Sequence, residues 1–392
     1  MIKRLAGCIR EYKRPTLLTL IFIIGEVIIE VFIPFIAADL VNQIKNGAQM
    51  STVMLQGGLL ILMAICSLAC GAIAGYTCAK ASAGFAKNLR GDLFRKIQTY
   101  SFENIDKFSS ASLVTRLTTD VGNAQMSYMM VIRTAIRAPL MFLFAIVMAY
   151  VMGGALATTF VVIVPVLICG LLLVAKFAMP AFRRVFKKYD RLNEAIEENV
   201  RGMRVVKGFS REGYEKEKFG AASEDIMKDF TRAERIVTLN TPIMQFCLYF
   251  NMIFVLIVGS RLAITSGGAS LDVGQISAML TYGMQILMSL MMLSMIYVIL
   301  TMSAESFKRI CQVLDEQSAL ENPESPIFDI ADGSVDFEGV SFKYSQKAKK
   351  NALSGIDLHI KSGMTVGIIG GTGSSKSTLV QLIPSLYDTT EG

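Results

Sequence analysis

The chain has 392 residues, of which 53% are hydrophobic and 18% are charged, and its formal net charge is +7. Soluble domains usually carry about 45–50% apolar and about 25% charged residues, so this composition excludes an ordinary soluble enzyme and indicates a membrane protein. The basic residues are spread along the chain rather than gathered in one patch, and we expect no nucleic acid among its partners. The seven cysteines lie mostly in apolar segments, and we expect no disulfide framework.

A basic, amphipathic segment at residues 1–14 precedes six apolar runs that indicate a polytopic α-helical membrane protein. A helix needs roughly 20 apolar residues to cross the hydrocarbon core, and the third run is short because Arg133 and Arg137 stand just before it. The run after Pro15 is too long for the core of a signal peptide. The expected spans are residues 15–41, 53–79, 137–152, 155–177, 242–264 and 276–302, within a six-span transmembrane domain at 15–303.

Two long connections, 80–136 and 176–241, are rich in Lys and Arg and keep helical spacing. The N-terminal segment carries five basic residues, so the positive-inside rule predicts a cytoplasmic N-terminus and cytoplasmic long connections. At a rise of about 1.5 Å per residue, the second helix would extend roughly 30 Å beyond the bilayer as a stalk. The stretches 102–112 (FENIDKFSSAS) and 207–219 (KGFSREGYEKEKF) break the pattern, and each predicts a short exposed helix or a solvated loop.

A change of pattern separates a second domain from the helical part. Residues 304–332 include the stretch SALENPESPIFDIAD and are expected to form a linker. Residues 333–392 then alternate as strands do, in SVDFEGVSFKYS, LSGIDLHI and MTVGIIG. This part predicts the first portion of a cytoplasmic α/β domain.

The stretch GIIGGTGSSKSTLVQ follows the P-loop pattern G-x-x-x-x-G-K-[ST] except at one position. A buried strand is expected at 364–369 and a helix at 376–383, which is the context that this pattern needs. Lys376 would reach the β- and γ-phosphates of ATP, and the Ser377 hydroxyl would ligate Mg²⁺. Ser375 replaces a glycine, at a cost on the order of 1 kcal/mol if the conformation is glycine-like. The candidate nucleotide-binding residues are Gly370, Gly371, Thr372, Gly373, Ser374, Ser375, Lys376, Ser377 and Thr378.

With these features the whole chain resembles a half-transporter of the ATP-binding cassette (ABC) exporter family, in its multidrug and lipid-exporter branch. The resemblance extends to SLVTRLTTDV, VRGMRVVKGFSREGYEKEKF, GVSFKYS and LIPSLYDTTEG. It implies a nucleotide-binding domain that takes ATP and Mg²⁺, coupling helices in the two long connections, and pairing with a second half-transporter. It also implies that Tyr344 stacks on adenine, with packing on its own sheet as the alternative. Ser385 and Thr389 depart from the family's usual residues at places away from the chemistry.

In this family the LSGGQ signature, the Walker B carboxylate and the switch histidine follow the P-loop, and the sequence to residue 392 contains none of them. The single histidine, His359, precedes the P-loop and does not match the switch. We therefore expect that this chain alone does not hydrolyse ATP and that it is a shortened form of a longer product. The favoured function is ATP-driven export of an amphipathic small molecule or lipid by a dimer. The alternative is a non-catalytic remnant or a regulatory partner of a full-length subunit.

Residues inside the expected spans are candidates for substrate contact. Glu26 and Glu30 are spaced i, i+4 in the first span, which suggests a site for a cationic or proton-coupled substrate, or else pairing with an arginine. Met288 and Met295 belong to a methionine stripe in the sixth span, typical of an adaptable binding surface or of ordinary packing. A GxxxG motif at residues 71–75 predicts close helix packing.

Overall fold

The computed structural model describes residues 2–266, 271–318, 320, 329, 332–344, 348 and 350–392. Within this part of the chain it contains six helical segments that are long and apolar enough to cross a membrane, which confirms the expected architecture. Their bounds are Arg4–Lys45, Met50–Gln98, Ser110–Gly153, Thr158–Arg201, Glu212–Thr265 and Val273–Asp315. All seven cysteines are free, as expected. Contacts divide the chain into two compact units.

One unit comprises Pro15–Cys78 and Met130–Val298. Tyr282 is completely buried in its core and donates its hydroxyl hydrogen to the Val31 carbonyl at 2.8 Å, which ties the sixth span to the first. The helices that contribute are α2 (Lys13–Lys45), α3 (Met50–Gln98), α6 (Val121–Gly153), α7 (Thr158–Arg201), α8 (Met203–Gly208), α9 (Glu212–Thr238), α10 (Asn240–Thr265) and α11 (Val273–Asp315).

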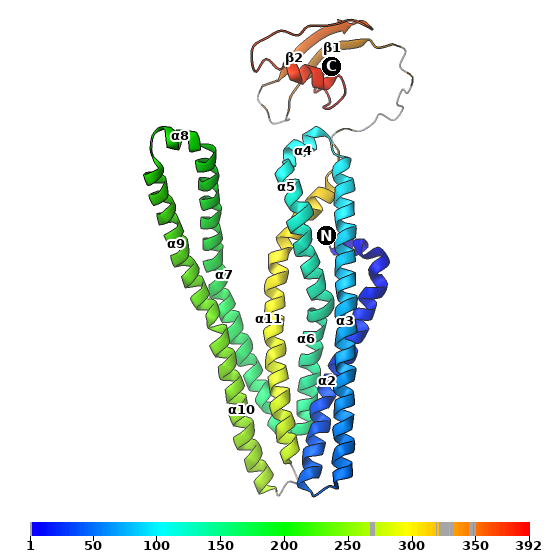
Figure 1. Cartoon of the computed structure of the whole chain (residues 1–392), viewed down its shortest axis with the longest axis vertical. Coiled ribbons are helices and arrows are strands. Elements are labelled where there is room, and N and C mark those ends of the chain that lie inside the picture. Colours follow the sequence, from blue (N-terminus) through cyan, green and yellow to red (C-terminus); the bar gives the residue numbers. More distant parts are fainter. Residues whose placement is uncertain are drawn as a thin grey trace. The chain divides into compact units, whose positions relative to one another are not determined.

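Helices α7 and α9 run side by side as a long hairpin that α8 closes (Figure 1). The turn out of α8 passes through Ser210, whose φ of 50° reverses the chain direction. Glu212 and Glu215 occupy the first turn of α9, where the partial positive charge of a helix N-terminus favours carboxylates. The prediction of a short helix at 207–219 is therefore wrong in position, because α8 ends at Gly208 and the long helix α9 begins at Glu212.

The other unit comprises Met1–Arg14, Ala79–Met129 and Ile299–Gly392. Here α3 continues to Gln98 as the expected stalk, and residues 102–112 form short helices as expected. Ser101 caps α4 through a reciprocal pair of hydrogen bonds with Asn104, so the helix has a defined start. The remaining elements are α1 (Ile2–Ala6), η1 (Gly7–Tyr12), α4 (Phe102–Phe108), α5 (Ser110–Thr115) and the π-helical turn η2 (Arg116–Asp120).

The end of α11 is bound to the neighbouring helices of this unit. The Tyr100 hydroxyl donates to the Val313 carbonyl at 2.6 Å, and Lys107 Nζ on α4 lies 2.6 Å from Glu316 Oε1. The expected linker at 304–332 is thus helical up to Asp315, and most of its remainder lies outside the described residues.

Two antiparallel strands and one helix form the α/β part of this unit. Strands β1 (Val335–Phe342) and β2 (Leu353–Ile360) pair in a register that places His359 opposite Asp336, and His359 Nδ1 lies 2.9 Å from Asp336 Oδ1. Helix α12 covers Lys376–Leu382, close to the predicted bounds. The buried core of this α/β part is formed by Phe337, Val340, Phe342, Leu353 and Leu382.

The predicted strand at 364–369 is wrong. Among the described residues β1 and β2 are the only strands, and neither pairs with this run. An extended segment becomes a strand only through hydrogen bonds to a neighbour, so an apolar pattern without an adjacent strand is not sufficient. The side chains are correspondingly exposed, by 60% at Met364 and 98% at Ile369.

Candidate functional site

The glycine-rich loop before α12 is held together by Lys376. The Nζ atom of Lys376 donates to the carbonyl oxygens of Gly370 at 2.9 Å and Gly371 at 2.7 Å. Ser374 Oγ lies 3.2 Å from the same Nζ and donates to the Gly371 carbonyl at 2.9 Å. The ammonium group therefore lies within the curve of the loop, and its three donors can be shared with or transferred to phosphate oxygens.

The loop leaves its backbone accessible. Gly371 and Gly373 have no atom within 4 Å of an ideal Cβ position, so a ligand can approach their N–H groups closely. Gly373 has φ of 85°, which favours glycine. Thr372 and Ser377 are exposed, and the Ser377 hydroxyl is free to meet a cation. These residues fit a nucleoside triphosphate with its Mg²⁺ ion.

Ser375 adopts the conformation that the P-loop pattern reserves for glycine. Its φ of 59° and ψ of 25° lie in the left-handed region, directly before α12. A residue with a Cβ pays roughly 1–2 kcal/mol there, because the Cβ approaches the following carbonyl oxygen. The backbone at Ser375 is therefore glycine-like, which is the condition on which the expected cost depended.

Tyr344 packs against its own domain. Its ring lies 4.9 Å from that of Phe342 and 5.3 Å from that of Tyr387, in both cases edge to face. Its hydroxyl lies 2.8 Å from Thr378 Oγ1, so the Thr378 side chain, 5% exposed, points to the sheet side of α12. Tyr344 remains 46% exposed, and its stacking on adenine stays a prediction.

Tyr387 links the nucleotide-binding part to α4, within one compact unit. Its hydroxyl donates to Asp106 Oδ2 at 3.0 Å, and its ring lies 6.1 Å from Phe102. Burial, followed by the hydrogen bond to Asp106, raises the pKa of Tyr387 to about 12. This pair was not predicted from the sequence, in which the aromatic of LIPSLYD and the aromatics among charges at 102–112 are the available signals.

Glu26 and Glu30 meet an arginine between helices α2, α3 and α6. Arg137 Nη2 lies 2.7 Å from Glu30 Oε2 and 3.4 Å from Glu26 Oε1. A Cβ on Gly71 would stand 3.2 Å from Glu26 Oε1, so the glycine of the GxxxG motif makes room for this carboxylate. The contacts therefore show the arginine pairing that was the alternative interpretation. A substrate role for the two carboxylates stays a prediction.

The methionine stripe lies on the surface of the chain. Met288 is 49% exposed and Met295 is 61% exposed, and Met284 and Met291 are similarly open. Packing within the described part of this chain therefore covers only about half of each of these side chains. A substrate role for Met288 and Met295 stays a prediction.

A family model and the similar proteins all indicate the same family. Residues 16–290 match the ABC transporter transmembrane region. An uncharacterized ABC transporter ATP-binding protein of Bacillus subtilis, YfiB, is 31% identical over 384 residues, and one of Mycobacterium tuberculosis, Rv1273c, is 31% identical over 386 residues. A fatty acid ABC transporter ATP-binding/permease protein of Mycobacterium bovis is 28% identical over 304 residues, which are 78% of this chain and 47% of that protein.

The first two alignments cover 98% of this chain and 66% of each relative, so the chain spans slightly less than two thirds of their length. They therefore include the loop at 370–378 as well as the spans. The family match alone extends from the first span into the sixth. The chain thus belongs to the ABC transporters, as the transmembrane region and a part of the nucleotide-binding domain of an exporter-type half-transporter.

Proposed function

We propose that the chain is a subunit of an ATP-driven exporter that moves an amphipathic small molecule or lipid across a membrane by alternating access. The observation that carries this proposal is the loop at 370–376, whose lysine amine and open glycine backbone suit a triphosphate, in one chain with six apolar helices. The name of the Mycobacterium bovis relative, a fatty acid transporter, supports an amphipathic substrate. The working unit is a dimer with a second half-transporter.

The orientation belongs to the same proposal. The basic N-terminus, both long connections and the nucleotide-binding part lie in the cytoplasm, and the chain resides in the cell membrane. The distribution of Lys and Arg supports this orientation. The strained Ser375 supports a heterodimer in which this chain provides the weaker nucleotide site.

Photolabelling with azido-ATP tests the nucleotide site. Lys376→Ala should abolish labelling, because it removes the amine that faces the loop, whereas Lys361→Ala, in an exposed turn of the same domain, should leave labelling intact. Labelling that survives Lys376→Ala and is competed by ATP would place the nucleotide elsewhere and contradict the proposal.

The cluster of Glu26, Glu30 and Arg137 allows a test of substrate choice in proteoliposomes. Glu26→Gln with Glu30→Gln should reduce export of cationic dyes but not of neutral ones. Because that variant leaves Arg137 without its partners, the triple variant that adds Arg137→Gln controls for a buried unpaired charge. Unchanged selectivity in both variants would exclude a cation-binding role.

A second candidate is a nucleotide-binding subunit that regulates a full-length partner without hydrolysing ATP itself. The strained backbone of Ser375 in the nucleotide-binding loop favours it. Proteoliposomes that hold a full-length subunit with or without this chain distinguish the two. A transporter subunit is required for export, whereas a regulatory subunit changes the rate of phosphate release of a full-length dimer that exports without it.

A further inference from the structure

The N-terminal segment and the stalk of α3 together carry a large excess of positive charge. Residues 1–14 and 79–98 contain ten lysines and arginines against two carboxylates. A third carboxylate, Asp315 at the end of α11, pairs with Arg4 of the N-terminal segment. Ten cations against three carboxylates leave these two segments strongly basic.

The N-terminal segment packs directly on α3, within one compact unit. Arg10 Nη2 lies 2.9 Å from Asp92 Oδ2 on the stalk. Gly84 makes room for the ring of Tyr12, because a Cβ at this glycine would overlap the ring. The absence of a side chain at Gly84 therefore lets the two basic segments approach each other closely.

Four exposed cations surround this contact and are called here the basic cluster: Lys13, Arg14, Lys80 and Lys87. Lys80 precedes Gly84 by four residues and Lys87 follows it by three, so helical spacing places both on the side of α3 that meets Tyr12. None of the four cations has an ion-pair partner in the part of the chain that the structure describes. Their charges are available to another molecule.

The basic cluster lies where the exposed surface changes from apolar to charged. Leu17, 59% exposed, follows Arg14 by three residues on α2, and Tyr76, 70% exposed, precedes Lys80 by four residues on α3. On both helices an exposed apolar or aromatic side chain thus lies one turn to the membrane side of a cation. This order is typical of the level at which acyl chains meet lipid headgroups.

We propose that the basic cluster binds the headgroups of anionic phospholipids in preference to those of zwitterionic ones. Lysine and arginine donate charge-assisted hydrogen bonds to phosphate oxygens, and clustered cations beside a bilayer attract anionic lipids. The headgroup bridges Lys13 and Lys80, and the acyl chains lie along Leu17 and Tyr76. The lipid therefore fastens the N-terminal segment to the stalk. This proposal requires that the chain spans a bilayer, and it does not depend on export.

The sequence contains no tryptophan, so a single fluorescent reporter can be introduced. Tyr76→Trp places an indole one turn before Lys80. In nanodiscs, quenching by brominated phosphatidylglycerol and by brominated phosphatidylcholine gives the apparent association constant of each lipid at the reporter. The anionic lipid should bind more tightly. Leu55→Trp, exposed near the other end of α3, is the matched control and should show no preference.

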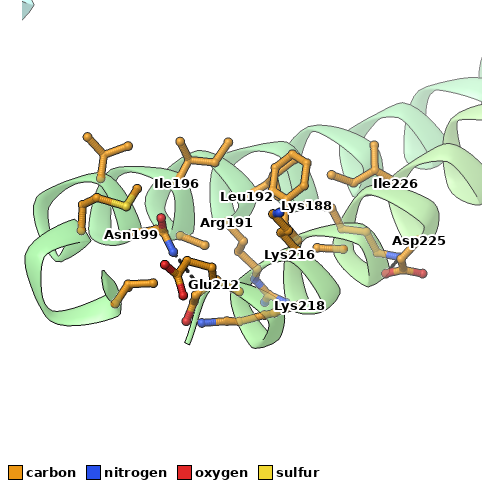
Figure 2. Close-up of a pocket in the computed structure, with 17 residues that line it drawn as sticks. Lys188, Arg191, Leu192, Ile196, Asn199, Glu212, Lys216, Lys218, Asp225 and Ile226 are labelled. Atoms are coloured by element: carbon orange, nitrogen blue, oxygen red, sulfur yellow. Dashed lines mark hydrogen bonds and ion pairs between the residues drawn. The ribbon is translucent and has the colours of Figure 1, made fainter. Parts of the chain in front are cut away.

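Variants of the basic cluster test which charges select the lipid. Lys80→Gln and Lys87→Gln should each lower the preference at the Tyr76→Trp reporter about two- to fivefold, as expected for exposed ion pairs. Lys218→Gln, on the hairpin of α7 and α9 (Figure 2), should leave the preference unchanged. Quenching by the zwitterionic lipid should be the same in every variant, which shows that the spans remain folded. Raising the salt concentration from about 0.1 M to about 1 M shortens the screening length from about 10 Å to about 3 Å and should reduce the preference.

Three results would overturn the proposal. Equal association of the two lipids at the Tyr76→Trp reporter would mean that the basic cluster does not select headgroups. A preference that persists when Lys80→Gln and Lys87→Gln are combined, or that is equally large at Leu55→Trp, would assign the selection to another part of the chain. If neither lipid quenches the Tyr76→Trp reporter, protein rather than lipid covers this face, as it would in contact with a second half-transporter.

Discussion

Replacing Ser375 by glycine should strengthen nucleotide binding at the loop. Ser375 has φ of 59° and ψ of 25°, a left-handed conformation that glycine adopts without strain. The relief of roughly 1–2 kcal/mol is offset by about 0.5–1 kcal/mol of backbone entropy that glycine loses when the loop is fixed. The net gain lies between about 0 and about 1.5 kcal/mol, and its midpoint corresponds to about threefold tighter binding, since each 1.4 kcal/mol is tenfold.

A series at this position separates the backbone effect from that of the hydroxyl. Competition of azido-ATP labelling by ATP should give the affinity order Gly, then Asn, then Ser and Ala together, then Val. Asn tolerates the left-handed region better than most residues, and a β-branched side chain tolerates it worst. If Ser375→Gly and Ser375→Ala bind ATP equally well, the left-handed backbone carries no cost and the reasoning fails.

Three further changes test other contacts. Tyr387→Phe should lower the free energy of unfolding by about 1 kcal/mol because it removes one hydrogen bond. A double-mutant cycle with Asp106→Ala in thermal unfolding should give a similar coupling, and zero coupling contradicts the contact. Gly71→Val should lower the free energy of unfolding by about 1–3 kcal/mol, because the larger side chain overlaps the Glu26 carboxylate. Gly57→Val on the same helix, with open space around it, should not lower the melting temperature, and equal effects would refute this packing. The hydrogen bond to an aspartate raises the pKa of His359 from 6.5, so its stabilisation is complete below about pH 6.5 and is lost as pH rises through the folded-state pKa. His359→Gln should therefore flatten the pH dependence of unfolding above that value, and an unchanged slope would exclude this ion pair.

The spans and the stalk of α3 could be predicted because both depend on local properties. A run of apolar residues must form a helix to satisfy its backbone in a bilayer, whatever its neighbours are. The charged continuation from Lys80 to Gln98 keeps helical spacing without proline, so nothing in it ends the helix.

The strand at 364–369 and the helix at 207–219 were mispredicted for different reasons. A strand depends on a partner elsewhere in the chain, and the apolar alternation alone does not reveal whether that partner is present. At 207–219 the aromatic and charged residues were grouped into one segment, whereas the turn at Ser210 divides them.

The site was predictable where a motif fixes the spacing. Lys376 and the glycines follow from the P-loop pattern, and the strain at Ser375 follows from its single departure. The contact of Tyr387 with Asp106 joins residues 281 positions apart, and the pairing of Arg137 with Glu30 joins residues 107 positions apart. Such long-range pairs depend on the packing of helices, which periodicity does not specify.

The bare run from Met364 to Ile369 has a practical consequence. Among the described residues, the backbone from Thr365 to Ile369 has no partner strand, and such apolar backbone is a template for strand addition from another molecule. Concentrated preparations should therefore self-associate through this run even when detergent covers every membrane helix. A lysine in place of Ile369 should keep the particles monodisperse, because a charge at an exposed edge resists such pairing.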